Sequence, residues 1–113
     1  MHYQGTWESD KIELRIREDV RRIAERIFKR KRKKLKIEAT LELNFLPDFP
    51  IIGEYVYGEA FPGEKRVKID VYAPMTTNRA LNETISEELT HIKHPELAHN
   101  ARFWRLVRQA MKG

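Results

Sequence analysis

The sequence predicts an α+β fold in which helices near both ends of the chain flank a small three-stranded sheet. Two kinds of hydrophobic spacing support this: apolar residues recur every three or four positions near both ends, and every second position in the middle. Short loops join the alternating segments, which favours a mainly antiparallel or mixed sheet. With 113 residues, the chain is expected to form one domain, residues 1–113.

The first helix is predicted to run from Lys11 to about Lys33. Its apolar positions are spaced by three and four, at Ile12, Ile16, Val20, Ile23, Ala24, Ile27 and Phe28. Ile12, Leu14 and Ile16 also alternate. A second interpretation therefore stays open, in which a short strand reaches Arg17 and the helix begins near Glu18.

Three strands are predicted next, at Leu35–Phe45, Gly53–Phe61 and Arg66–Tyr72. Each is bounded by residues that break regular structure. Two prolines interrupt the chain after the first strand, in the segment 47–50, and Ala73-Pro74 follows the third. The segment 62–65, Pro-Gly-Glu-Lys, is suited to a hairpin connection between the second and third strands.

Two further helices complete the predicted fold. The first runs from Asn78 to about Lys93, with N-cap candidates at positions 76–78. Pro95 disfavours helical geometry at His94 and so ends this helix. A final short amphipathic helix is indicated by Phe103, Val107 and Met111, with Trp104 and Ala110 beside them.

Composition restricts the chemistry. Cysteine is absent, so a transition metal would be held by imidazole and carboxylate groups. No segment approaches the roughly 20 apolar residues that cross a bilayer, and no signal peptide is recognised; we expect a cytoplasmic protein with no membrane partner. Charged residues make up 35% of the chain, a balance that leans toward a thermophilic source.

The chain is also basic, with a net charge of +5. Seven of its 22 Lys and Arg residues lie in the segment Lys29–Lys36. One interpretation is a nucleic-acid-binding module, since such a cluster binds phosphate. The other is the solvated C-terminal end of a helix, where cations are favoured by the helix dipole and where no aromatic residue is interleaved to stack on bases.

Three of the four histidines lie between Asn82 and His99. At about 100° per residue, Glu87 and His91 project in nearly the same direction, while an apolar stripe forms a separate face. This stripe comprises Leu81, Ile85, Leu89 and Ile92. One side of the helix can therefore be buried while the other faces a cleft. His94 is expected at the surface, with a role as an alternative ligand as the second interpretation, and the terminal His2 is expected to take no part.

The segment from Ile85 to Pro95, followed by His99 and Phe103-Trp104, resembles the active-site region of small zincin metallopeptidases. Chain length and element order are most similar to the minigluzincins of thermophilic prokaryotes. In that family a His-Glu-x-x-His helix supplies two zinc ligands and the general base, and a later histidine is the third ligand. The resemblance implies that His91 and His99 bind zinc and that Glu88 is the catalytic base.

One position departs from the family pattern. Glu87 stands where the family has its first histidine, and a carboxylate there still presents an oxygen to the same side. A zinc site of Glu87, His91 and His99 is therefore predicted. The added negative charge weakens the Lewis acidity of the metal relative to a three-histidine site, so hydrolysis is slowed or lost. A catalytically inactive zincin-like protein is the alternative.

The resemblance also implies a peptide or protein substrate, held extended along an exposed strand. Either the segment Arg66–Tyr72 or the segment Glu54–Phe61 is the candidate strand. In this family the C-terminal segment can block the cleft, within one chain or across a homodimer, which gives a latent zymogen. Thr84, one turn before Glu88, is a candidate for assisting the site.

Overall fold

The computed structural model describes residues 13–14, 17–46, 56–71 and 76–112. The predicted α+β fold is confirmed, with three helices and a small mixed sheet. The helices are α1 (Arg17–Leu35), α2 (Asn78–Lys93) and α3 (Ala101–Met111). The strands are β1 (Glu13–Leu14), β2 (Thr40–Phe45), β3 (Val56–Phe61), β4 (Arg66–Val71) and β5 (Thr76–Thr77).

The start of α1 follows the second of the two interpretations. Strand β1 pairs antiparallel with β5, and the helix begins at Arg17 rather than at Lys11. Glu18 and Asp19 lie in the first turn of α1, where acidic side chains interact favourably with the helix dipole.

The predicted strand from Leu35 is wrong over its first five residues, because α1 continues to Leu35. Lys36 then adopts a left-handed conformation with φ of 58°. Its N–H donates to Lys33 O and the N–H of Ile37 donates to Arg32 O, the pairing of a Schellman motif. Glycine usually marks such a helix end, so a lysine there hides the boundary, and β2 begins only at Thr40.

The three longer strands form one sheet in the order β2-β4-β3. Strand β4 runs parallel to β2 and antiparallel to β3, so the sheet is mixed. A 3₁₀ turn, Pro62–Glu64, followed by Lys65 with φ of 51°, makes the predicted connection between β3 and β4. Residues 53–55 and 72 of the predicted strands lie outside the described residues.

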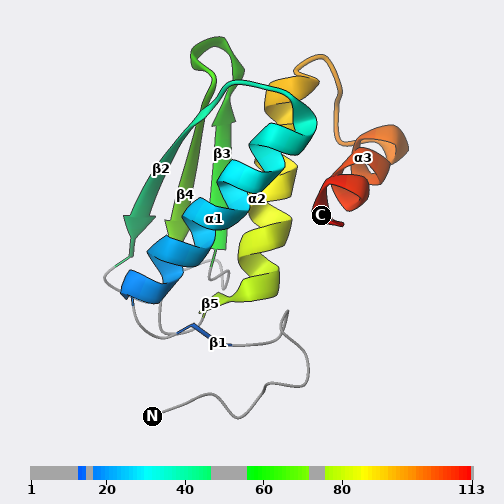
Figure 1. Ribbon diagram of the computed structural model, residues 1–113. Coiled ribbons are helices and arrows are strands. Elements are labelled where there is room, and N and C mark those ends of the chain that lie inside the picture. The colour runs from blue at the N-terminus through cyan, green and yellow to red at the C-terminus, as the bar shows by residue number, and fades with distance from the viewer. Residues whose placement is uncertain (1–12, 15–16, 47–55, 72–75, 113) are drawn as a thin grey trace.

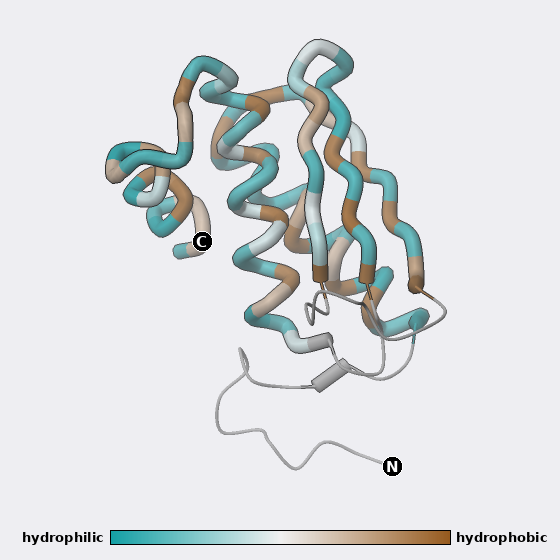
Figure 2. Tube along the Cα trace, turned by 180° about the vertical axis from the view of Figure 1, so that it is seen from behind, coloured by the Kyte–Doolittle hydropathy of each residue, from teal (hydrophilic) through white to brown (hydrophobic). Residues whose placement is uncertain are grey.

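Helices α1 and α2 cover the same face of the sheet (Figure 1). Alternate residues of β4, Val67, Ile69 and Val71, are fully buried beneath them, as the period of two requires. The strands show this alternation as brown and teal segments (Figure 2). The helices contribute Val20, Ala24, Ile27, Phe28, Leu81, Ile85 and Leu89 to the same apolar core.

Helix α3 packs against α2 on the side away from the sheet (Figure 1). The predicted caps of α2 are confirmed: Thr77 Oγ1 accepts a hydrogen bond from Ala80 N–H, and the helix ends at Lys93 before Pro95. Asn100 caps α3 by accepting from Phe103 N–H at 2.9 Å. Among the described residues, no helix combines the length and apolar character needed to cross a membrane.

Candidate metal centre

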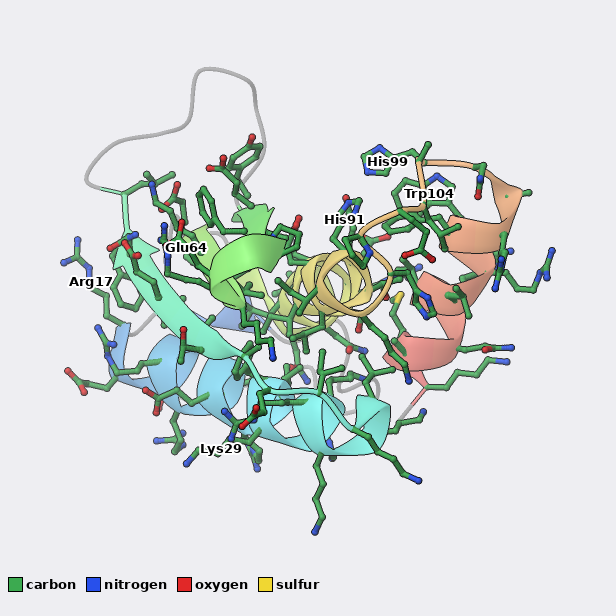
Figure 3. The ribbon with its side chains drawn as sticks, turned by 90° about the horizontal axis from the view of Figure 1, so that it is seen from above. Arg17, Lys29, Glu64, His91, His99 and Trp104 are labelled. Carbon is green, nitrogen blue, oxygen red and sulfur yellow. The ribbon has the colours of Figure 1, made fainter. Side chains whose placement is uncertain are left out.

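Helix α2 and the loop that follows it bring together Glu87, His91 and His99. Each offers one ligand atom, and these three atoms lie within 4.8 Å of one another. Glu87 and His91 share a face because they are one helical turn apart. The chain then turns after His94, so that His99 returns to the end of the helix, where its ring lies near that of His91 (Figure 3).

The two imidazoles contact each other directly. Their Nε2 atoms are 2.9 Å apart, so one nitrogen donates a hydrogen bond and the other accepts it. The Phe103 ring stacks on His91 with a centroid distance of 4.4 Å, and Trp104 lies 5.4 Å from His99. Phe103 is fully buried. Phe103 thus joins the loop that carries His99 to the interior, and its ring contacts both imidazoles.

The chemistry of this donor set fits a zinc ion. Two imidazoles and one glutamate are a ligand set used in catalytic zinc sites, which keep one position open. Tetrahedral zinc with bonds of about 2.1 Å separates its ligand atoms by about 3.4 Å, so the two imidazole nitrogens, now 2.9 Å apart, need to separate by about half an ångström. Burial, and then the nearby His99, lower the pKa of His91, which favours the neutral form that binds metal.

Glu88 lies beside this trio but is buried, with 5% of its surface exposed. Burial is the main cause that raises its pKa to about 7, and the carboxylates of Glu87 and Glu59 add to the effect. A carboxyl group with a pKa near neutrality both accepts and releases a proton at physiological pH. Glu88 therefore has the protonation behaviour of a general base or acid.

Strand β3 passes very close to α2 at Glu88. A Cβ atom built on Gly58 would lie 2.7 Å from Glu88 Cγ and 2.7 Å from Thr84 Cγ2. Only glycine fits there without displacing these side chains. Thr84 thus packs beneath β3 through its methyl group, which is a packing contact with Gly58.

A cleft runs between β3 and the C-terminal half of α2. It is lined by Tyr57, Gly58, Glu59, Ala60, Pro62, Glu87, Glu88, His91, Pro95 and His99. Strand β3 is at the edge of the described sheet, whereas β4 is paired on both sides. Of the two candidate strands, the segment Arg66–Tyr72 is therefore the wrong choice for adding an extended peptide, whereas β3 has an edge that no described strand pairs with.

Other predicted residues lie apart from this cleft or outside the described residues. His94 caps the C-terminus of α2, and its Nδ1 is 3.8 Å from a Glu96 carboxylate oxygen. This agrees with the surface role expected for His94, while His2 lies outside the described residues. Sequence reasoning missed Gly58 and Tyr57 as cleft residues. An isolated glycine in an alternating strand was the available signal, because it often marks a close backbone approach.

Comparison with known proteins yields a match at the level of structure. No protein-family profile matches this sequence, and no curated protein matches it. The fold is similar to that of a metallopeptidase zymogen, abylysin from Pyrococcus abyssi, with a TM-score of 0.57. The match covers 80% of this chain and 81% of that one at 16% sequence identity. The chain therefore has a fold similar to that of a metallopeptidase.

Proposed function

We propose that this protein is a minimal zinc metallopeptidase of the minigluzincin type, with Glu87 in the place of the first ligand histidine. The observation that carries the proposal is the convergence of Glu87, His91 and His99 beside the buried Glu88. The fold match to a metallopeptidase zymogen supports it. A metal-activated water and a carboxyl base can together hydrolyse a peptide bond.

The residues of this chain would divide the work as follows. Glu87, His91 and His99 would hold the zinc ion, which would supply a Lewis acid for the scissile carbonyl and for the attacking water. Glu88 accepts a proton from the attacking water and passes it to the leaving amine. The free edge of β3 binds the substrate backbone in an extended conformation, so that the scissile bond lies above Glu88.

Glu87 determines how active the site is. A carboxylate ligand reduces the positive charge left on the metal, which weakens the Lewis acid relative to three histidines. Hydrolysis is therefore expected to be slow even when zinc is bound. Zinc uptake and peptide cleavage need to be measured separately.

The proposal is tested first by zinc binding. Protein purified without chelators is analysed for metal content, and metal-free protein is titrated with zinc by calorimetry. We expect one zinc ion per chain, with binding lost in the His91→Ala variant. Absence of bound metal together with no uptake in the titration contradicts the proposal.

Cleavage of an unfolded protein such as casein tests the second half of the proposal. The Glu88→Gln variant keeps the ligands but lacks the base, so it is expected to bind zinc and lose cleavage. The Glu87→His variant is expected to bind zinc more tightly and to cleave faster. If zinc binds but neither the wild type nor Glu87→His cleaves, the protein is a catalytically inactive relative.

Latency is a further part of the proposal. Helix α3 packs on the side of α2, where Asn82 Nδ2 donates to Met111 O at 3.1 Å. The residues that line the described cleft all precede α3. We propose that a block by the C-terminal segment comes from a partner chain in a homodimer. Size-exclusion chromatography tests this, with activity measured across the dilution range.

A further inference from the structure

The outer side of α1 carries a row of cations, called here the basic face: Arg26, Lys29, Arg30 and Lys33. Their spacing of three and four residues places them on one side of the helix. All four side chains are exposed, and none forms an ion pair with another residue that the structure describes. Glu25 is the acidic residue beside them.

The other cations of the basic segment have structural roles. Lys31 is 1% exposed. Arg32 donates to Ala39 O at 2.8 Å, and Lys34 donates to the Gln109 and Lys112 carbonyl oxygens at the end of α3. The continuous run in the sequence therefore divides into buried or bonded cations and the exposed cations of the basic face.

Helix stability does not account for the basic face. Like charges three and four residues apart each cost about 0.2–0.5 kcal/mol on a helix surface. The helix dipole compensates cations only within the last turn, and α1 ends at Leu35. Arg26 and Lys29 lie more than one turn before that end, so their charges destabilise the isolated helix.

We propose that the basic face binds the phosphate backbone of double-stranded nucleic acid. The basic face spans about 10 Å along the helix axis, and a duplex presents a phosphate about every 1.7 Å. Several phosphates therefore lie within reach of the four cations. Binding of this kind is independent of base sequence and sensitive to salt.

The surroundings of the basic face favour double-stranded nucleic acid over a membrane surface or a single-stranded nucleic acid. The exposed residues of α1 are all charged, and helices that lie on membranes bury apolar side chains among the lipids. Proteins that bind single strands stack the bases on aromatic side chains, and the exposed side of α1 presents none.

The basic face and the candidate metal centre lie on opposite sides of the molecule. Figure 3 shows Lys29 on the outer side of α1, whereas His91 and His99 are gathered beyond α2. Nucleic acid bound to α1 therefore leaves the cleft open.

Fluorescence anisotropy with a labelled duplex of about 20 base pairs, at salt between about 50 and 200 mM, tests the proposal. The logarithm of the binding constant should fall linearly with the logarithm of salt concentration, with a slope of up to about −3.6 for four contacts. The triple variant R26Q/K29Q/K33Q should reduce the magnitude of this slope by about 2.7. The single variant Glu25→Gln should bind more tightly.

The matched control is R102Q/R105Q/R108Q, which removes three exposed cations from α3 and changes the net charge equally. It should keep most of the affinity and of the salt slope, and circular dichroism verifies that both triple variants are folded. Equal weakening by the two triple variants overturns the proposal, because net charge alone then explains binding. Failure of the wild type to bind duplex, or a preference for single strands or anionic vesicles, also overturns it.

Discussion

Gly58→Ala is expected to be strongly destabilising for a reason that is purely steric. The backbone of Gly58 is outside the left-handed region, so alanine can adopt its conformation. The new methyl group would meet Glu88 Cγ at 2.7 Å, Thr84 Cγ2 at 2.7 Å and Glu88 Oε2 at 2.8 Å. Carbon atoms in favourable contact are about 3.5–4.0 Å apart. The strand and the helix must therefore separate, or Glu88 must rotate.

The magnitude follows from these contacts. Adding a methyl group to a well-packed interior typically costs 1–3 kcal/mol. Two carbon contacts are shorter than the favourable range by about 0.8 Å, and α2 is held on its other sides by α1 and α3. We expect the free energy of unfolding to fall by about 2 kcal/mol. The Glu88 carboxyl group should also move, so cleavage should decrease even at temperatures where the variant remains folded.

Urea denaturation of Gly58→Ala and Gly63→Ala provides a matched comparison. A Cβ atom on Gly63 meets nothing within 4 Å, so this control should change the free energy of unfolding by less than about 0.5 kcal/mol. Thr84→Ser removes one clashing methyl group and should recover part of the loss in the double variant. If Gly58→Ala is as harmless as Gly63→Ala, the close packing of β3 on α2 is refuted.

Three further predictions concern neighbouring parts of the chain. The free energy of unfolding of the metal-free protein should fall as pH rises from about 5 to 8, because the folded-state pKa of Glu88, about 7, exceeds the ordinary value of 4.5. Urea titrations at each pH should measure a total loss on the order of 3 kcal/mol. Glu88→Gln should remove this pH dependence. Phe103→Ala should lower the free energy of unfolding by about 3–5 kcal/mol and weaken zinc binding by calorimetry, whereas Val107→Ala on the same buried side of α3 should affect stability alone. Lys36→Gly should raise the free energy of unfolding by up to about 1 kcal/mol in urea titrations, because it relieves the left-handed conformation, and an unchanged or lower value would argue against strain there.

The sequence predicts α2 almost to the residue because its boundary signals are local. Thr77 caps the first turn through its own side chain, and Pro95 restricts the residue before it. The end of α1 was harder to predict from the sequence, since Lys36 occupies a position where glycine usually signals a helix end. A single unusual residue thus displaced the predicted start of the next strand from Thr40 to Leu35.

Part of the candidate site can also be predicted from local spacing, whereas the rest depends on contacts between distant segments. Helical spacing places Glu87 beside His91 before any fold is known. The approach of His99 depends instead on Phe103, which packs in the interior and contacts both imidazoles. The burial of Glu88 depends on β3, since the absence of a side chain at Gly58 lets the strand cover the carboxyl group. Such contacts between distant segments have no periodic signature in one sequence.

The charge arrangement of the cleft suits the divalent cation that the proposed function requires. The chain carries a net charge of +5, yet its cleft is lined by the carboxylates Glu59, Glu87 and Glu88. Their mutual repulsion contributes to the raised pKa of Glu88. A bound cation would offset this repulsion and lower the pKa of Glu88, which would favour the carboxylate form that the proposed base role needs at neutral pH. Glu87 would attract the cation through its charge, even though a histidine in its place is expected to bind zinc more tightly and to leave a stronger Lewis acid.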